Sequence, residues 1–429
     1  MERQPEVIII GAGAAGLAAA RLLTRAGLPV ALIEARQRIG GRIHTLHDPF
    51  SPVPVELGAE FIHGRPPEIW GAIQGGRLPV LEFSAEQWFI RSGKPERTDE
   101  FGAVERAMAP MRDAPEQSFE QFIEHSGAST ELKQWACRYV EGFHAARPEL
   151  VSVRSLALID EAQQRIGGDG AYRLQRGYWS LAEWLFAGAD SECLRTYFGT
   201  EVETVRWRRG HVAVAGRSFG RPMSLHAPRA IVTVPLGVLQ APEGERGAIR
   251  FDPDPEPLRT ARESIATGHA ARITLRFRRP VWEDREELRH AGFLFSDEEW
   301  MPTWWTSLPV RAPVVTGWTG GPRAEARAAE DPCAWLAGAL RTLARLLRMD
   351  ETSLTAELEA WHTHNWSADP FARGAYSYVR AGGLEAQKRF GDPVEDTLYF
   401  AGEAVNAEGQ VGTVHGAIAA GERAARFIV

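Results

Sequence analysis

Three glycines and one glutamate near the N-terminus have the spacing of a nucleotide-phosphate site. Gly11, Gly13 and Gly16 form a GxGxxG pattern, and Glu34 follows eighteen residues after Gly16. In this pattern the first glycine permits a tight turn, the second lets the backbone approach a pyrophosphate, and the third allows a helix to pack closely on a strand. The acidic residue accepts hydrogen bonds from ribose hydroxyls. These residues predict a dinucleotide site, for which FAD and NAD both remain open at this point.

The elements around these residues are the ones that such a site requires. Residues 6–10 and 30–33 are apolar runs typical of buried parallel strands, and the Ala/Leu-rich residues 17–25 between them predict a helix. A helix that begins at the glycine turn would direct its free N–H groups and the positive end of its dipole toward a phosphate. A glycine-rich turn in some other α/β unit would not account for Glu34 at the end of the second strand.

Further motifs extend this pattern along the chain. Residues 36–42 read RQRIGGR, residues 56–64 read ELGAEFIHG, and residues 412–417 read GTVHGA. In this order they resemble the motifs of the flavin amine oxidase superfamily, and the resemblance spans essentially the whole chain. It implies FAD as the cofactor and places the chain closest to the polyamine oxidase branch.

The glycine pattern and the resemblance together give a set of cofactor-binding residues. The set is Gly11, Gly13, Ala15, Gly16, Glu34, Arg36, Gly41, Arg42, Gly58, Ala59, Glu60, Val202, Glu403, Gly412, Thr413 and Val414. The resemblance implies that the Val202 backbone lies near the adenine and that Glu403 binds the ribityl or pyrophosphate region. The Ala-rich residues 413–427 predict a terminal helix, whose N-terminus would stabilise negative charge on a reduced flavin.

Four residues are expected on the reacting side of the flavin: His63, Arg272, Tyr376 and Thr413. The resemblance implies that Tyr376 is an aromatic wall that orients a neutral amine. Thr413 stands where monoamine oxidases carry a second tyrosine, which favours the polyamine oxidase and histone-demethylase-like branches. His63 lies in a run similar to the WIHG of animal and fungal polyamine oxidases, and a neutral imidazole there could hydrogen-bond the amine.

Two departures from the family pattern change the expected chemistry. Ala375 stands where monoamine oxidases carry the cysteine that is linked to FAD, so we expect a non-covalent cofactor. Arg272 matches a family lysine that holds a water against flavin N5. Because a planar guanidinium cannot simply copy a compact ammonium, we expect oxidase activity that is retained but slower with oxygen.

The implied reaction is oxidation of a C–N bond of an amine, with a polyamine-like substrate favoured. Hydride passes from the carbon next to nitrogen to the flavin, the imine hydrolyses to an aldehyde, and oxygen is reduced to hydrogen peroxide. An L-amino-acid oxidase, which needs an arginine for the substrate carboxylate, remains an alternative on the same fold. A monoamine oxidase, a desaturase or protoporphyrinogen-type oxidase, and a flavin-bound interaction protein without turnover are further alternatives.

Composition narrows the class of protein and its partners. The 429 residues are 44% hydrophobic and 24% charged, which is typical of globular domains, and 49 basic against 56 acidic residues give a net charge of −7. No basic run is present, which argues against a nucleic-acid partner. No apolar run of 18 residues occurs, so we expect no membrane span. Subtracting three lysines from 49 leaves 46 arginines, a bias that we attribute to coding preference.

The cysteines and histidines predict neither crosslinks nor a metal site. Cys137, Cys193 and Cys333 are odd in number and far apart, which excludes a disulfide framework and favours a reducing, cytoplasmic location. The pair His362 and His364 shows no matching carboxylate in the sequence, so we interpret both as structural. The sequence does not indicate an oligomeric state.

The motifs interleave along the chain, with no linker or repeat to mark domain boundaries. We expect an α/β protein in which residues 1–75, 170–250 and 380–429 form a Rossmann-like FAD-binding domain. Residues 76–169 and 251–379 would form an α+β substrate domain with a mixed or antiparallel sheet and flanking helices, the helical part spanning about 100–165. Its strands are predicted at residues 272–277, 302–308 and 313–319. Ser118 and Gln121 have the spacing of a capping box, and Trp304, Trp305 and Trp318 are expected in the core.

Overall fold

The apolar runs on either side of the glycine pattern form the centre of a five-stranded parallel sheet. In the computed structural model, which describes residues 4–83, 86–97 and 100–429, its strand order is β10-β2-β1-β14-β23. The strands are β1 (Val7–Ile10), β2 (Val30–Ile33), β10 (Leu194–Tyr197), β14 (Arg229–Val232) and β23 (Leu398–Phe400). The side chains of β1 are at most 3% exposed, because layers cover both faces of the sheet. This burial explains a continuous rather than an alternating apolar pattern.

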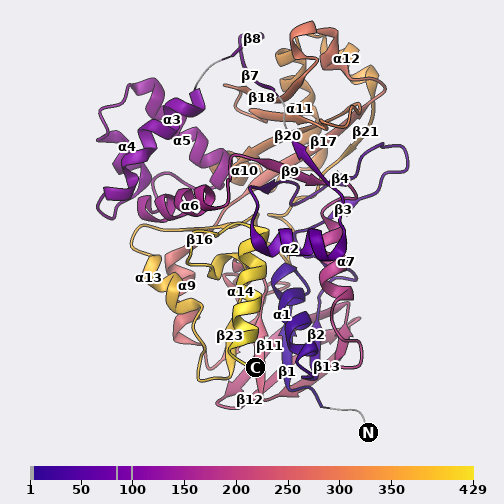
Figure 1. Cartoon of the computed structure of the whole chain (residues 1–429), viewed down its shortest axis with the longest axis vertical. Helices are drawn as coiled ribbons and strands as arrows, with labels where there is room; N and C mark the ends of the chain where they lie inside the picture. Colours follow the sequence, from indigo (N-terminus) through magenta and orange to yellow (C-terminus); the bar gives the residue numbers. More distant parts are fainter. Residues whose placement is uncertain (1–3, 84–85, 98–99) are drawn as a thin grey trace.

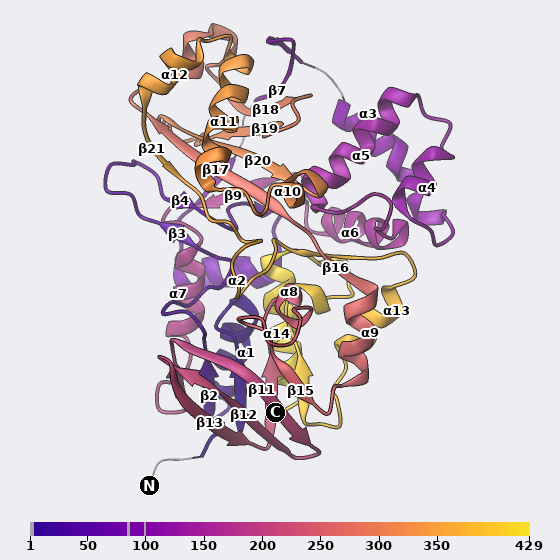
Figure 2. The same ribbon diagram turned by 180° about the vertical axis from the view of Figure 1, so that it is seen from behind.

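Helices cover one face of this sheet and a second sheet covers the other (Figures 1 and 2). The helices are α1 (Ala14–Arg25), α2 (Pro67–Gly76), α7 (Trp179–Ala187) and α14 (Val414–Arg426). The second sheet has the order β13-β12-β11-β15, from β11 (Thr200–Arg208), β12 (His211–Ser218), β13 (Arg221–Ala227) and β15 (Arg250–Asp252). Helices α1 and α14 approach so closely that a Cβ on Gly421 would lie 2.1 Å from the carbonyl oxygen of Ala15.

A seven-stranded mixed sheet forms the other lobe of the molecule, at the top of Figure 1. Its order is β21 (Leu358–His362), β17 (Ala270–Phe277), β20 (Val314–Gly320), β19 (Thr303–Thr306), β18 (Ala291–Ser296), β7 (Glu86–Arg91) and β8 (Lys94–Glu96). All neighbours are antiparallel except β18 and β7. The helices α10 (Pro322–Ala326), α11 (Pro332–Leu347) and α12 (Glu351–Glu357) belong to this lobe, and α11 packs on a core that contains the fully buried Trp304.

A helical group stands beside this sheet, at the upper left of Figure 1. It consists of α3 (Glu100–Met108), η1 (Ala109–Asp113), α4 (Phe119–Glu124), α5 (Thr130–His144) and α6 (Val153–Arg165). The predicted capping box at the start of α4 is confirmed, since Gln121 N donates to Ser118 Oγ and Ser118 N donates to Gln121 Oε1.

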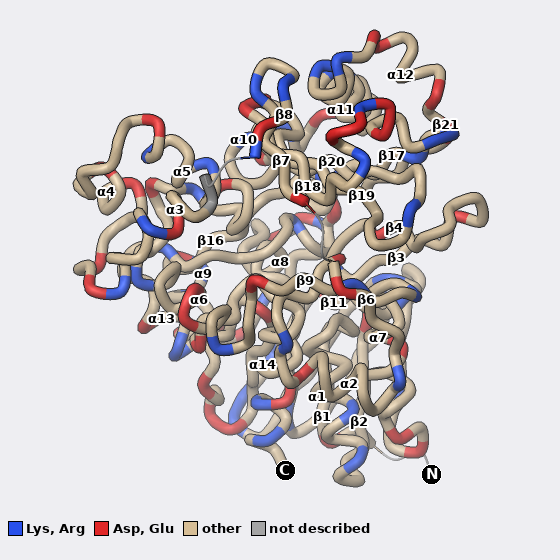
Figure 3. Tube along the Cα trace, turned by 45° about the horizontal axis from the view of Figure 1, so that its top comes forward, with Lys and Arg blue, Asp and Glu red and all other residues tan. Residues whose placement is uncertain are grey.

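Short elements connect these layers. The three-stranded sheet β5-β9-β6 consists of β5 (Ile62–His63), β9 (Ala171–Leu174) and β6 (Val80–Phe83), and two strand pairs are β3 (Thr45–Leu46) with β4 (Val55–Glu56) and β16 (Ile265–Thr267) with β22 (Ser377–Val379). The remaining helices are α8 (Leu236–Leu239), α9 (Glu256–Ser264), α13 (Leu384–Phe390), η2 (Val281–Asp284), η3 (Glu286–Leu288) and η4 (Glu403–Val405). Charges of both signs are scattered along the trace in Figure 3. Within the described ranges, none of the helices has the length and apolar character needed to cross a bilayer.

Candidate active site

One cavity of about 980 Å³ extends from the parallel sheet to the seven-stranded sheet. Its lining includes Gly13 and Glu34 at one end and His63 and Trp305 at the other. Every sequence-predicted site residue lines it except Gly16. Gly16 lies beneath the cavity, where a Cβ would be 1.9 Å from the carbonyl oxygen of Gly11. The third glycine of the pattern is therefore required by packing.

The glycine turn forms a cradle that suits an anionic ligand. Gly11 has φ of +106°, a conformation that favours glycine. A Cβ on Gly13 would have only one neighbour within 4 Å, the Gly40 carbonyl oxygen at 4.0 Å, so this backbone faces open space. Gly13 is also the N-cap of α1 and provides no side-chain cap. The N–H groups of the first helical turn are thus available to a phosphate.

Glu34 lies at the same end of the cavity and keeps acceptor capacity. Its Oε2 accepts a hydrogen bond from Ala12 N and its Oε1 accepts one from Arg36 N, both at 2.9 Å. A carboxylate has about four acceptor positions, so about two remain for ribose hydroxyls. The geometry therefore fits the ribose-binding role predicted for Glu34.

A second cluster joins the arginine of the RQRIGGR run to the C-terminal motif. Arg42 Nη1 donates to Glu403 Oε1 at 2.9 Å and also contacts the carbonyl oxygen of Ala375. Glu403 Oε2 accepts from Ser377 Oγ at 2.6 Å and from Gly412 N at 3.0 Å. Glu403 is 5% exposed, so these three contacts satisfy a buried carboxylate, and Arg42 balances its charge. The fold thus brings together three of the predicted cofactor residues, Arg42, Glu403 and Gly412.

Glu60 and Arg272 form a buried ion pair at the opposite wall. Arg272 Nη2 donates to Glu60 Oε2, and Arg173 Nε donates to Glu60 Oε1 at 2.8 Å. Trp305 Nε1 adds a third bond to Glu60, at 3.0 Å. Burial opposes the charge on Glu60, but Arg173 and Arg272 outweigh this effect and hold its pKa below the ordinary value. The carboxylate of Glu60 is therefore satisfied by protein groups, a partnership that the sequence interpretation missed.

The guanidinium of Arg272 is fixed on several sides. Its Nη1 donates to the carbonyl oxygen of Gly58 at 3.1 Å, and its Cζ lies 5.4 Å from the centroid of the Trp305 ring. Its Nε is buried and has no hydrogen-bond partner among the described residues. Trp304 is fully buried as predicted, and Trp305 is buried as well but also lines the cavity. Trp318 is only partly buried and lines the cavity.

The predicted reacting-side residues His63 and Tyr376 meet at the last turn of α5. The hydroxyl of Tyr376 donates to the carbonyl oxygen of Phe143 at 2.7 Å, and the ring of Phe143 lies 5.6 Å from the ring of His63. Burial lowers the pKa of His63 to about 4, so the imidazole is neutral at neutral pH. Thr413 also lines the cavity, but its hydroxyl donates to Gln410 O and accepts from Gly416 N as the cap of α14.

The family model for flavin containing amine oxidoreductases matches residues 14–86 and 91–429. This chain belongs to that family. Its geometry and its relatives identify an FAD-dependent oxidoreductase that acts on CH–NH or CH–NH2 groups, near the polyamine oxidase branch.

Relatives and solved structures agree with this membership. Probable polyamine oxidase 4 of Arabidopsis thaliana is 28% identical over 99% of this chain and 86% of its own length. Human lysine-specific histone demethylase 2 is 28% identical over 98% of this chain and 53% of its own length. A structure of putrescine oxidase bound to putrescine has a TM-score of 0.82 at 21% identity and covers 99% of both chains. Cyclohexylamine oxidase from Brevibacterium oxydans has a TM-score of 0.81 at 19% identity and covers 99% of this chain and 98% of that chain. At such identities the structural likeness shows the shared mixed α/β fold.

The helical part predicted at about residues 100–165 supplies part of the wall of this flavin amine oxidoreductase. Trp135, Tyr139 and Phe143 recur every four residues on α5 and all line the cavity. Their spacing places the three rings on one face of the helix, although none of them was among the predicted site residues. His362 and His364 do have carboxylate partners, because Asp48 and Asp369 lie 3.3 and 2.8 Å from their Nε2 atoms. Across the described residues, no three His, Cys, Asp or Glu side chains are grouped so as to hold a metal ion.

Proposed function

We propose that this chain oxidises a polyamine-like substrate at a C–N bond, with FAD held non-covalently in the long cavity. The observation that carries the proposal is the continuity of this cavity, which joins the phosphate cradle at Gly13 to the His63–Tyr376 end. In this proposal the parallel sheet and its helices form a Rossmann-like FAD-binding domain from residues 1–75, 170–250 and 380–429. Residues 76–169 and 251–379 form the substrate domain.

The residues that would hold FAD are those of the cradle and of the two arginine clusters. Gly13 and the N-terminus of α1 would bind the pyrophosphate, Glu34 the ribose, and the Arg42–Glu403 cluster the region beyond it. The bound flavin supplies a two-electron acceptor for hydride from the substrate, and oxygen then yields hydrogen peroxide. Ala375 offers no thiol for a covalent bond.

The chain itself positions the amine and controls its protonation. His63 is neutral and can accept a hydrogen bond from the substrate nitrogen. The bond from Tyr376 to the Phe143 carbonyl oxygen fixes the orientation of the aromatic wall. Phe61 and Phe293 extend this wall and exclude water from the reacting carbon. We also infer a cytoplasmic location from the three free cysteines, which fit a reducing compartment.

A carboxylate on α5 supports a substrate with a second cationic group. Glu141 lines the cavity two residues before Phe143, and no described residue donates a hydrogen bond to it. Burial raises the pKa of Glu141. Its ion pair with Arg323 is long, at 3.7 Å between Arg323 Nε and Glu141 Oε2. An ammonium group of a polyamine would supply the missing donors.

Arg323 favours a second candidate, an amine that carries a carboxylate, as in an amino-acid oxidase. This residue also lines the cavity, and no described residue accepts a hydrogen bond from its guanidinium, whose contact with Glu141 is the 3.7 Å ion pair through Nε. A guanidinium with free donors can bind a substrate carboxylate bidentately. The two candidates make opposite predictions, because Glu141 attracts an ammonium and Arg323 repels it.

The test is anaerobic reduction of the bound flavin, which is measured through the loss of its yellow colour. We expect spermine or acetylated spermidine to bleach the enzyme faster than benzylamine or α-amino acids. Glu141→Gln should raise the apparent dissociation constant for spermine at least tenfold and leave that for benzylamine unchanged, whereas Arg323→Gln should lower the spermine value. Fastest reduction by an α-amino acid, abolished in Arg323→Gln, would replace the polyamine assignment by the second candidate. No reduction by any amine would refute both.

A further inference from the structure

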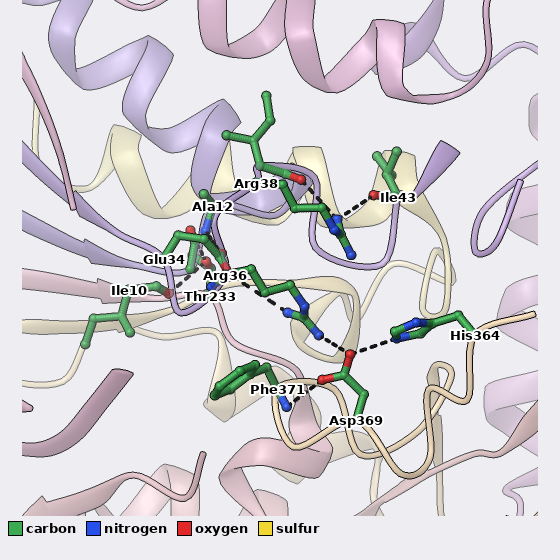
Figure 4. A network of polar contacts seen from close by, with 12 residues as sticks. Ile10, Ala12, Glu34, Arg36, Arg38, Ile43, Thr233, His364, Asp369 and Phe371 are labelled. Atoms are coloured by element: carbon green, nitrogen blue, oxygen red, sulfur yellow. Dashed lines mark hydrogen bonds and ion pairs between the residues drawn. The ribbon is translucent and has the colours of Figure 1, made fainter. Parts of the chain in front are cut away.

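Arg36, at the nucleotide end of the cavity, is held by a segment that lies 333 positions away in the sequence. Figure 4 shows Arg36 pointing toward Asp369, whose Oδ2 accepts a hydrogen bond from Arg36 Nη2 at 2.7 Å. His364 Nε2 lies 2.8 Å from the same oxygen, and Phe371 N donates to Asp369 Oδ1 at 2.9 Å. Asp369 thus connects the segment between β21 and β22 to the loop that follows Glu34.

The contacts around Asp369 are those that a buried carboxylate requires. The side chains of Arg36 and Asp369 are 16% and 9% exposed. Burial would raise the pKa of Asp369, but the hydrogen bonds from His364, Arg36 and Phe371 prevail and hold it well below its ordinary value. The attraction within a buried ion pair offsets the cost of removing both charges from water only when both partners are also hydrogen-bonded in this way. The arrangement is therefore a defined site for the Arg36 guanidinium.

His364 is itself fixed by packing. Its ring centroid lies 4.1 Å from that of Trp366 and 5.7 Å from that of His44. Trp366 Nε1 donates to the carbonyl oxygen of Leu57 at 2.7 Å, which anchors this aromatic group to a residue of the cavity lining that directly follows β4. His364 can therefore hold Asp369 in one orientation.

Arg38 and Arg42, the other two arginines of the loop that follows Glu34, bond other groups, which leaves Arg36 as the arginine beside Glu34. Arg38 Nη1 donates to the carbonyl oxygens of Ile39 and Ile43, both at 3.1 Å, and closes the loop on itself (Figure 4). Arg42 bonds Glu403 further along the cavity. Arg36 lines the cavity beside Glu34, 3.9 Å from its Oε1, and has five N–H donors of which Asp369 takes one.

We propose that Asp369 and His364 are positioning residues that hold the Arg36 guanidinium against the adenylate half of FAD. A guanidinium fixed beside a ribose-binding carboxylate suits the phosphate and ribose of that half. The inference rests on the proposed function only in that FAD is the ligand. It also connects cofactor and substrate sites, because the same segment carries Ala375, whose carbonyl oxygen contacts Arg42, and Tyr376 of the substrate wall.

The test measures nucleotide affinity of the apoprotein and needs no turnover. FAD is titrated by quenching of its fluorescence, and ADP, which contains the adenylate half, is titrated as a competitor. Asp369→Asn should lower the affinities for FAD and for ADP by the same factor, about 10- to 100-fold, which is the range for loss of a hydrogen bond between charged groups. His364→Gln should lower both affinities by a smaller factor. Circular dichroism of each apoprotein establishes that it is folded.

Arg373→Gln is the matched control on the same segment. Arg373 Nη1 bonds Glu245 at 2.6 Å, and Arg373 is not among the described residues that line the cavity, so its loss should change both affinities less than twofold. The proposal is overturned if Asp369→Asn leaves FAD affinity unchanged, if it weakens FAD but not ADP, if Arg373→Gln has an equal effect, or if ADP does not compete in the parent. Failure of the proposed function is distinct from these outcomes, because it would show as FAD that binds normally but that no amine reduces.

Discussion

Replacing Glu60 by glutamine tests whether the buried ion cluster at the cavity wall has the charges assigned to it. The substitution keeps the size of the side chain and removes its charge. Arg173 and Arg272 would then face each other across a neutral amide. Glutamine can still accept bonds through one oxygen, but its NH2 group would meet at least one guanidinium or the Trp305 N–H, all of which are donors.

The magnitude follows from the burial of the cluster. The side chains of Glu60, Arg272 and Arg173 are 12%, 7% and 14% exposed. Removing one partner of a buried ion pair costs about 3–5 kcal/mol, because a charge remains uncompensated. With an unfolding entropy of about 2.1 cal/mol/K per residue, a chain of 429 residues that unfolds as one unit would lose about 3–6 °C in Tm.

Thermal unfolding of the FAD-loaded protein, followed by circular dichroism, measures this change. Glu325→Gln is the matched control, because Glu325 bonds Arg147 at 2.7 Å with side chains that are 40% and 38% exposed. Such a surface pair contributes at most about 1 kcal/mol, which corresponds to about 1 °C. Equal shifts in the two variants would refute the reasoning. Because the pKa of Glu60 is lowered in the folded state, its stabilisation exists above the ordinary glutamate pKa and fades as pH falls, so parent and Glu60→Gln should converge in acid.

Three further outcomes are expected. Acid precipitation should leave the yellow flavin in the supernatant, because Ala375 cannot form the covalent link; flavin in the pellet would contradict this. Arg272→Lys should speed reoxidation of the reduced enzyme in air-saturated buffer, measured by stopped flow, since a compact ammonium can hold a water that the fixed guanidinium cannot; an unchanged rate would remove this argument. Burial lowers the pKa of His144 to about 4, below the value of about 6.5 expected in the unfolded chain. Its stabilisation is therefore lost as pH falls through this range, by about 2 kcal/mol between pH 7 and pH 5. His144→Gln should make the decline in the urea midpoint shallower, and an equally steep decline would argue against a neutral His144.

Local features of the fold were predictable because they depend on neighbouring residues. The terminal helix predicted at residues 413–427 is observed at Val414–Arg426, and the strand predicted at 313–319 is observed at Val314–Gly320. Helix α1 begins at Ala14, three residues before the predicted start. The prediction began too late because glycine has a low helix propensity, whereas Gly16 is part of the helix and packs where a Cβ would not fit. That a second β-sheet covers the parallel sheet was not predictable, since this packing depends on contacts between distant segments.

Candidate site residues were predictable by position more than by what their side chains contact. All four reacting-side residues line the cavity, and so do most of the cofactor residues. The sequence could not show that Thr413 caps α14, although threonine is a common cap residue. It also could not show that the Glu60 carboxylate is bound by Arg173, because the two residues are 113 positions apart.

Three of the arginines have a structural role beyond any coding preference, because they connect segments that are distant in the sequence. Arg36 bonds Asp369, Arg272 bonds Glu60, and Arg42 bonds an acidic residue of the C-terminal motif, over sequence separations of 333, 212 and 361. A guanidinium has several donors in a fixed plane, so it can bond a carboxylate and a backbone carbonyl at once, as Arg42 and Arg272 both do. A lysine at these positions would keep the charge but lose one of the two directions. The several donors that let arginine connect distant segments also fix the guanidinium of Arg272 in one position. We therefore expect the effect of Arg272 on oxygen chemistry to depend on the geometry of its head group rather than on its charge.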